Sequence, residues 1–324
     1  MNTDLQKLIS IVVPAYNEDA VLVEFHTILC ETLADLPIDL EIVYINDGST
    51  DNTLSIISDL RSNDNRITLI DLSRNFGKEI AMSAGLHKAA GDAVVVIDAD
   101  LQDPPELIPE LIKQWQNGFD VVYAKRTRRD GESLLKKTTA HFFYRIIQRV
   151  GRFTIPEDTG DFRLLSRRAV NAVNTFKEYH RFMKGLFAWI GFRQTAVHYQ
   201  RNARRAGKTK WNYWHLWNFA LDGITSFTIA PLKLSTYLGM TTAVSALAYG
   251  TYMVIDTLLY GNPVPGYPSL VVIILVLGGI QLMAIGILGE YLGRIFNETK
   301  QRPLYFINEY LPSDKASSRH PGDF

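Results

Sequence analysis

The chain has 324 residues, of which 47% are hydrophobic and 21% are charged, and its formal net charge is zero. This neutral balance gives no electrostatic reason to expect a nucleic-acid partner. The single cysteine, Cys30, excludes an internal disulfide and fits a reducing cytosolic face. The first ten residues lack the basic and apolar pattern of a cleaved signal peptide, so none is expected.

The N-terminal part of the chain alternates short apolar runs with segments of helical spacing. Strands are expected at five runs rich in valine and isoleucine: Ile9–Val13, Glu41–Asn46, Ile67–Asp71, Ala93–Asp98 and Val121–Ala124. Helices are expected between them: Val21–Leu33, Asp51–Asn63, Lys78–Ala90 and Pro105–Asn117. The alternation predicts an α/β fold with a mostly parallel sheet and flanking helices. Ligands of such sheets bind at the carboxyl ends of the strands.

The loop after the fourth expected strand carries the most specific motif, two acids two residues apart, Asp98 and Asp100, followed by Gln102 and Asp103. Carboxylates at the end of a buried strand are costly unless a positive charge neutralises them. Mg²⁺ or Mn²⁺ prefers such oxygen-rich sites and can bridge phosphate oxygens. The motif therefore predicts a divalent metal site, and the alternative is an ordinary aspartate cap on the next helix.

Two neighbouring loops, Pro14–Glu18 and Asn46–Thr53, follow the first and second expected strands. Loops that combine an acid, a glycine and hydroxyl groups can hold the base and ribose of a nucleotide with fixed donors and carboxylates. The alternative for each loop alone is a turn with a helix cap, for which Ser49, Thr50 and Asp51 supply the oxygens. Because the three loops belong to one sheet edge, their coincidence favours a nucleotide site.

Two segments follow the alternating region. The stretch Glu157–Leu165 reads as an acid-glycine-acid turn that offers candidates for a general base. The basic run Arg201–Lys210 is suited to clamping phosphates. A polybasic patch at a membrane surface is an equally good interpretation of this run, and the two interpretations are compatible.

The C-terminal third contains two long apolar segments. Leu234–Tyr260 has one charged residue, Asp256, and Leu270–Gly289 has none. Each exceeds the ~18 apolar residues that mark a candidate membrane span, and the alternative is a pair of buried core helices. Basic residues flank the pair whereas the linker Gly261–Ser269 has none, so both termini are expected in the cytoplasm.

The expected domain organisation has four parts. Residues 1–210 form a cytosolic nucleotide-sugar-binding catalytic domain, 211–230 an amphipathic interfacial helix region, 231–293 a two-helix transmembrane anchor and 294–324 a cytosolic tail. Core packing is the alternative for the aromatic segment Trp211–Phe227. Pro312–Phe324 is expected to be a loose polar tail.

Five motifs taken together resemble family 2 glycosyltransferases of the dolichol-phosphate-mannose synthase type: VVPAYNE, NDGSTDNT, SRNFGKEIAMSAGL, IDADLQDPPE and DTGDFRLLSRRAV. With the two apolar segments, the chain more narrowly resembles bacterial bactoprenol (polyisoprenyl-phosphate) glucosyltransferases. The resemblance implies a GT-A-type fold and inverting, metal-dependent transfer of a hexose from a nucleotide sugar to polyprenyl (undecaprenyl) phosphate at the cytoplasmic face. Glucose from UDP-glucose is the foremost expectation, with mannose or an aminosugar as alternatives.

The resemblance also implies roles for single residues. Asp98, Asp100 and Gln102 would form the Mg²⁺ or Mn²⁺ site, and Asp161 and Asp100 would be catalytic. Contacts to the nucleotide sugar would come from ten residues: Pro14, Ala15, Tyr16, Glu18, Asp47, Lys78, Asp98, Arg126, Arg201 and Lys208. Asp161 is chosen over Asp158 because it stands in the family's Asp-Phe-Arg context, and Lys78 is also expected to order a catalytic loop.

Other classes of protein fit the sequence less well. A processive polysaccharide synthase would carry a Gln-x-x-Arg-Trp run, and a dinucleotide-binding oxidoreductase would carry Gly-x-Gly-x-x-Gly after a strand; neither is present. A lipid-sugar flippase or scaffold would need polar groups at mid-membrane, where only Gln281 lies deep in a span. The apolar spans would also allow a homo-oligomer.

Overall fold

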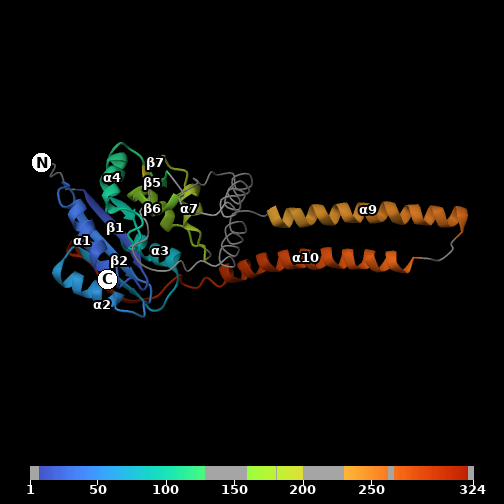
Figure 1. Ribbon diagram of the computed structural model, residues 1–324, viewed down its shortest axis with the longest axis horizontal. Helices are drawn as coiled ribbons and strands as arrows, with labels where there is room; N and C mark the ends of the chain where they lie inside the picture. The colour runs from blue at the N-terminus through green and yellow to red at the C-terminus, as the bar shows by residue number, and fades with distance from the viewer. Residues whose placement is uncertain (1–6, 128–158, 180, 200–229, 262–265, 320–324) are drawn as a thin grey trace.

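The computed structural model describes residues 7–127, 159–179, 181–199, 230–261 and 266–319. They form a three-layer domain of helices and a central sheet, from which a long helical hairpin projects (Figure 1). The sheet has eight strands in the order β7-β5-β6-β4-β1-β2-β3-β8. Their bounds are β1 (Leu8–Ala15), β2 (Asp39–Asn46), β3 (Ile67–Leu72), β4 (Ala93–Val96), β5 (Val121–Arg126), β6 (Thr159–Ser166), β7 (Gln194–Tyr199) and β8 (Ile307–Leu311).

The centre of the sheet is parallel, and its flanks are mixed. Strands β4, β1, β2 and β3 run parallel, as do β5 and β7. Strand β6 lies antiparallel between β4 and β5, and β8 lies antiparallel to β3. The predicted α/β fold is confirmed, with a parallel core to which antiparallel strands are added on both sides.

Helices cover both faces of the sheet because the strands bury apolar side chains on both. On one face lie α1 (Leu22–Leu33), α2 (Thr53–Asn63), the short η1 (Pro105–Leu107) and α4 (Ile108–Gln116). On the other lie α3 (Lys78–Lys88), α6 (Arg167–Asn174) and α7 (Met183–Trp189). Strand β1 shows the division: Ile11 faces the first layer and Val12 the second, as the two-residue period of a strand requires.

The predicted strands and helices of the first 125 residues are confirmed, with small differences at their ends. Strand β4 ends at Val96, so that Asp98 lies in the turn beyond it rather than in the strand. The prediction of a turn across Glu157–Leu165 is wrong from Thr159 onward, because Thr159–Ser166 is the fully buried strand β6. The buried side chains of Phe162 and Leu164 pack into the core on one face of the sheet, and that of Leu165 packs into the core on the other.

The expectation of a loose polar tail is also wrong over Pro312–Arg319. The chain returns from the hairpin to form β8, and α11 (Asp314–Arg319) follows it. Asn308 Nδ2 donates to Asp71 Oδ2 at 2.8 Å, and the Ser313 amide donates to Thr68 Oγ1 at 3.0 Å. The sheet therefore includes residues far beyond position 210, because β8 covers the otherwise open edge of β3.

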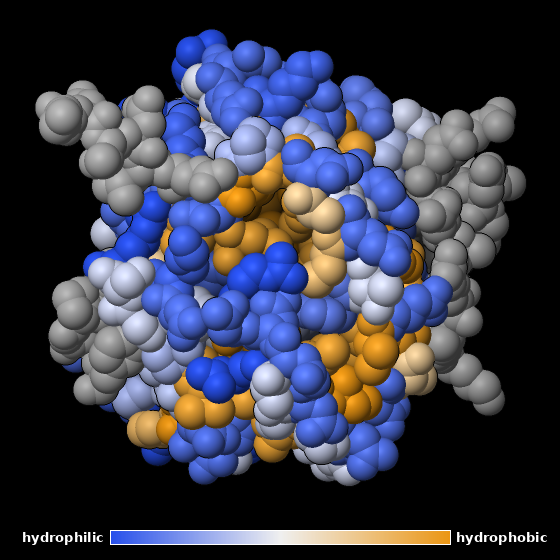
Figure 2. Space-filling view, turned by 90° about the vertical axis from the view of Figure 1, so that its left-hand side faces the viewer, coloured by the Kyte–Doolittle hydropathy of each residue, from blue (hydrophilic) through white to orange (hydrophobic). Residues whose placement is uncertain are grey.

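The hairpin consists of α9 (Ala230–Tyr260) and α10 (Tyr267–Thr299), which run side by side away from the sheet (Figure 1). Pro231–Tyr260 and Val272–Thr299 are long and apolar enough to cross a membrane, and their apolar windows are not buried inside the protein. This exposure argues against the alternative of buried core helices. The end of the domain that faces away from the hairpin shows hydrophilic residues around a hydrophobic hollow at its centre, with a further hydrophobic area toward the lower right (Figure 2).

Removing the C-terminal strand should destabilise the sheet. A chain that ends after Pro303 loses β8, α11 and their bonds to β3, and should lose about 3 kcal/mol of stability. For a domain of this size such a loss corresponds to a fall of roughly 6–12 °C in the melting temperature. Deletion of residues 320–324 alone is the control and should change little. Equal melting temperatures for the two truncated chains would show that β8 does not stabilise the sheet.

Candidate active site

The loops that follow β1 and β2 are joined to each other by hydrogen bonds. The Asn17 amide donates to Ser49 Oγ at 3.1 Å, and the Thr50 amide donates to Asn17 Oδ1 at 2.8 Å. The Glu18 amide donates to Thr53 Oγ1 at 2.9 Å. Asn17 has a φ of 55°, a left-handed conformation that asparagine adopts more readily than most residues. The two predicted nucleotide loops thus form one continuous rim at the strand ends.

The helix-cap interpretation of the second loop is wrong about the position of the cap, because the N-cap residue of α2 is Asn52, which makes no side-chain cap hydrogen bond, and Asp51 lies one residue before it. Asp51 Oδ1 accepts a hydrogen bond from the Thr53 amide at 3.0 Å, at the start of α2. On the rim itself, Tyr16 is exposed, whereas Ala15 is buried in β1. Of the predicted nucleotide contacts on these loops, the Tyr16 ring is therefore the most accessible to a ligand, and Ala15 can offer little beyond its backbone.

Asp47 holds the loop between β3 and α3 against the end of β2. Its buried carboxylate accepts hydrogen bonds from the amides of Phe76 at 2.7 Å and Gly77 at 2.9 Å. Beside it, Gly48 has a φ of 63°, and a Cβ there would lie 2.4 Å from the Arg74 carbonyl carbon. Only glycine permits this close approach. Asp47 therefore positions the start of α3, a role that the sequence does not reveal.

Lys78, the first residue of α3, joins two of the predicted site acids. Its Nζ donates to Asp98 Oδ2 at 2.7 Å and to Asp161 Oδ2 at 2.6 Å. The acids come from different strands: Asp98 follows β4, and Asp161 lies in β6. The register that pairs Val96 with Arg163 brings them together, since it aligns the end of β4 with the start of β6. We call Lys78, Asp98 and Asp161 the site cluster.

The charges in the site cluster are strongly coupled. Burial would lower the pKa of Lys78, but the carboxylates of Asp161 and Asp98 outweigh it and raise that pKa above its usual range. Burial would raise the pKa of Asp161, but Lys78, Lys184 and Arg163 hold it well below its usual range. For Asp98, burial prevails over Lys78, and the pKa is raised. Lys78 and Asp161 are therefore both charged at neutral pH.

The turn Asp98–Asp103 is tightly constrained. The Gln102 amide donates to Asp100 Oδ1 at 3.1 Å, and Leu101 adopts a φ of 57° with its side chain buried. Near this turn, the buried Asp161 Oδ1 has no hydrogen-bond partner among the described residues. Carboxylate and amide oxygens are hard ligands, and the unpartnered oxygen next to them is what a bound cation or polar substrate would satisfy. Asp98, Asp100 and Gln102 fit the predicted divalent metal.

Arg126 belongs to a second polar group at the site. Its Nε donates to Tyr199 Oη at 3.2 Å, and its Nη2 lies 3.7 Å from Asp103 Oδ1. Tyr199 Oη also donates to Asp103. Burial and the Asp103 carboxylate raise the pKa of Tyr199 to about 12, so its hydroxyl stays protonated. No motif in the sequence points to Tyr199, which lies in β7, outside the expected strands, and Asp103 is only the third acid of the motif that begins at Asp98.

Glu79 is a further acid that the sequence does not single out. It follows Lys78 in α3, and its Oε2 accepts a hydrogen bond from the Met183 amide at the start of α7, at 2.9 Å. Burial and the charge of Asp161 raise its pKa to about 7. In the sequence it reads as an ordinary acid in the first turn of a helix.

The structure thus brings together most of the residues that the sequence proposed. Lys78, Asp98 and Asp161 are in direct contact, Asp100 and Gln102 lie in the adjoining turn, and Pro14, Tyr16, Glu18 and Asp47 lie at the same strand ends. Arg201, Lys208, Asp158 and the aromatic segment Trp211–Phe227 lie outside the described residues.

Comparison with known proteins gives two family matches, to glycosyl transferase family 2 over residues 10–173 and to the GtrB C-terminal hairpin over residues 230–295. The chain is 52% identical to an uncharacterized glycosyltransferase of Synechocystis sp. over 314 residues, 95% of this chain and 99% of that protein. It is 50% identical to the bactoprenol glucosyl transferase of Shigella phage SfV over 299 residues, 92% of this chain and 97% of that protein.

Among solved structures, one similar protein is glucosyl-3-phosphoglycerate synthase from Mycobacterium tuberculosis, in complex with Mn²⁺, UDP-glucose and phosphoglyceric acid. It shares 22% identity and a TM-score of 0.45, and the match covers 68% of this chain and 78% of that chain.

Proposed function

The chain belongs to glycosyl transferase family 2, and from this premise we propose that it transfers glucose from UDP-glucose to polyprenyl phosphate, with inversion, at the cytoplasmic face of a membrane. The observation that carries the proposal is the site cluster at the strand ends of a chain that also holds two candidate membrane spans. Relatives named as bactoprenol glucosyl transferases, matched over nearly their full length, support the choice of glucose and of a polyprenyl acceptor.

The donor side of the reaction is assigned to the rim and the acidic turn. The rim formed by the β1 and β2 loops receives the nucleoside, with the exposed Tyr16 ring as a surface for the base. Mg²⁺ or Mn²⁺ held by Asp98, Asp100 and Gln102 would supply positive charge against the pyrophosphate and so improve the leaving group. Arg126, which Tyr199 and Asp103 orient, lies beside Gly160 and is placed to contact a phosphate.

The acceptor side is assigned to Asp161 and Lys78. A phosphate monoester has a second pKa near ~6 and is largely ionised at neutral pH, so the nucleophile needs no strong base. Asp161 is held ionised and fixed by Lys78 through Oδ2, which leaves Oδ1 to face the reacting centre. There its negative charge stabilises the positive charge that develops on the sugar ring during glycosyl transfer.

The hairpin explains why the acceptor can be a lipid. The phosphate of a polyprenyl lipid stays at the headgroup layer, so the enzyme must be held there. The amide of Tyr179 donates to Glu298 Oε1 near the end of α10 at 2.8 Å, which ties the hairpin to the segment that precedes α7. Basic residues at the domain end of the hairpin, Arg294, Lys300 and Arg302, favour a cytoplasmic domain with both termini on that side.

The test is an incubation of the purified full chain with polyprenyl phosphate and a panel of labelled nucleotide sugars, followed by extraction of the lipid. UDP-glucose should label the lipid most rapidly, a chelator should stop the labelling, and added Mg²⁺ or Mn²⁺ should restore it. Labelling from a mannose or aminosugar donor instead would change the assignment of the transferred sugar. Activity that survives chelation would show that the transfer does not require the proposed metal. No labelled lipid from any donor would overturn the proposed reaction.

A further inference from the structure

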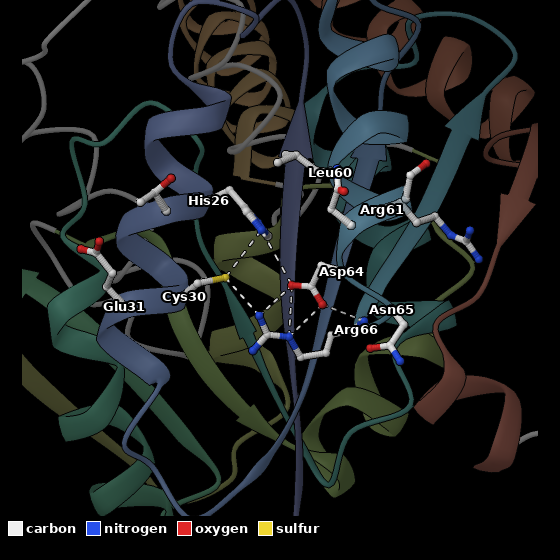
Figure 3. A pocket seen from close by; sticks show the side chains of 11 residues that line it. His26, Cys30, Glu31, Leu60, Arg61, Asp64, Asn65 and Arg66 are labelled. Carbon is white, nitrogen blue, oxygen red and sulfur yellow. Dashed lines mark hydrogen bonds and ion pairs between the residues drawn. The ribbon is translucent and has the colours of Figure 1, made fainter.

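A second cluster of metal-ligand side chains lies away from the strand-end site, in an open pocket of about 800 Å³ between α1 and α2 (Figure 3). His26 and Cys30 project from successive turns of α1, and Asp64 lies just after α2. We propose that His26 Nε2, Cys30 Sγ and Asp64 Oδ2 bind a zinc ion. This inference is independent of the glycosyl transfer proposed above.

One ligand atom from each of His26, Cys30 and Asp64 lies within 4.8 Å of the others, and the two spacings from His26 are close to those of a zinc site. His26 Nε2 lies 3.6 Å from Cys30 Sγ and 3.8 Å from Asp64 Oδ2. With Zn–S near ~2.3 Å and Zn–N or Zn–O near ~2.0 Å, neighbouring ligands of a tetrahedral zinc lie about 3.3–3.6 Å apart. Small side-chain movements would therefore complete three ligand positions, and the fourth would open to the pocket, where water can enter.

His26 is already oriented as a metal ligand. Its Nδ1 lies 3.1 Å from the hydroxyl of the buried Tyr44, and its Nε2 faces Cys30 and Asp64. When Nδ1–H donates to Tyr44, Nε2 keeps the lone pair that a metal needs, which is the usual second-shell arrangement of ligating histidines. Burial, which outweighs the nearby Asp64 carboxylate, lowers the pKa of His26 and keeps the imidazole neutral at neutral pH.

The guanidinium of Arg66 contacts two of the proposed ligands and supplies positive charge to them when no metal is bound. Its Nη2 donates to Asp64 Oδ2 at 2.7 Å and to Cys30 Sγ at 3.3 Å. The side chain is 39% exposed and lines the pocket, so it has room to turn outward. Burial raises the pKa of the Cys30 thiol despite Arg66, so zinc must displace both a proton and this guanidinium. Arg66 is therefore a competitor of the metal.

The site ties α1 to the connection that leads into β3. Asp64 precedes β3, which starts at Ile67 and runs toward the strand ends where the site cluster lies. The cluster around His26 thus lies toward the other end of that strand, and bound zinc would act on the stability of the α1–α2 layer rather than on the transfer reaction.

The test uses Co²⁺ and Zn²⁺ on the full chain in detergent, in an Asp98→Asn/Asp100→Asn background that removes the predicted metal site of the transferase. Co²⁺ should give the near-ultraviolet absorption of a cobalt–thiolate bond, and one equivalent of Zn²⁺ should abolish it. Cys30→Ser should lose the band, and His26→Gln and Asp64→Asn should weaken binding. Tyr44→Phe should weaken binding about 10–100-fold, because it removes the partner that orients His26.

Two variants separate the proposal from adventitious binding to the pocket. Glu31→Gln removes an acid that lines the same pocket without belonging to the three ligands, and it should leave the band unchanged. Arg66→Gln should tighten Co²⁺ binding, since it removes the competing cation. Zn²⁺ should also raise the melting temperature of the background protein and not that of its Cys30→Ser variant. The absence of a cobalt–thiolate band in the folded background protein, or a band that survives Cys30→Ser, would overturn the zinc site.

Discussion

Replacing Asp98 with asparagine should nearly abolish glycosyl transfer. Asp98 lies in the turn after β4, beside Lys78, and with Asp100 it supplies the carboxylates of the proposed metal site. A neutral amide at this position weakens the binding of the cation that offsets the negative charge of the pyrophosphate. The loss of one strong electrostatic contact of this kind typically lowers turnover about 10²–10³-fold. Asp100→Asn should have an effect of the same order.

The control for both variants is Glu106→Gln, which removes an exposed acid from the helical turn that follows the same loop. It should leave the rate within the error of the assay. Rates should be measured over a series of Mg²⁺ and Mn²⁺ concentrations, because a weakened metal site requires more metal for half-maximal activity. A variant at Asp98 that keeps most of its activity in the presence of a chelator would refute the metal assignment.

Replacing Asp161 with asparagine should lower turnover about 10²–10⁴-fold while donor binding is preserved. Asp161 is buried, and only its Oδ2 is paired, with Lys78, among the described residues, so in the proposed reaction its charge would act at the reacting centre and not at the nucleotide rim. The asparagine can keep one hydrogen bond with Lys78 but carries no charge to oppose that of the sugar ring.

Calorimetry with UDP-glucose and a turnover assay on the same protein distinguish the two roles of Asp161. Unchanged donor affinity with slow turnover supports its place at the reacting centre. Lost donor affinity with normal turnover at saturating donor would assign Asp161 to the donor site instead. Lys78→Met is the companion variant, and it should slow turnover as well, because Asp161 and Asp98 would both lose the cation between them.

Local patterns in the sequence are sufficient to predict the strands and helices whose buried residues are apolar and regularly spaced. The runs that became β1 to β5 are rich in valine and isoleucine, and the helices between them carry apolar residues at helical spacing. The local pattern does not indicate strand β6, because Gly160, Asp161 and Arg163 resemble a polar turn, although all three residues are buried. Burial of such residues is decided by their neighbours on β4 and β5, which a local pattern does not contain.

The site shows the same limit. Acids at the ends of strands were recognisable from their position in each loop, so Asp98 and Asp100 could be proposed directly. The proximity of Asp161 to Asp98 depends on the antiparallel register of β4 and β6, and the bonds of Asp47 to Phe76 and Gly77 depend on how one loop rests on another. Such pairings join distant parts of the chain, and only the folded arrangement reveals them.

The position of β8 has a consequence for biosynthesis. The strand that completes the sheet beside β3 leaves the ribosome only after both helices of the hairpin have been translated. Until then the nascent domain carries an open edge strand, which is prone to wrong pairing. The final folding step of the sheet therefore comes after the whole hairpin has been translated, and a ribosome that stalls within the hairpin would leave a transferase domain without its last strand.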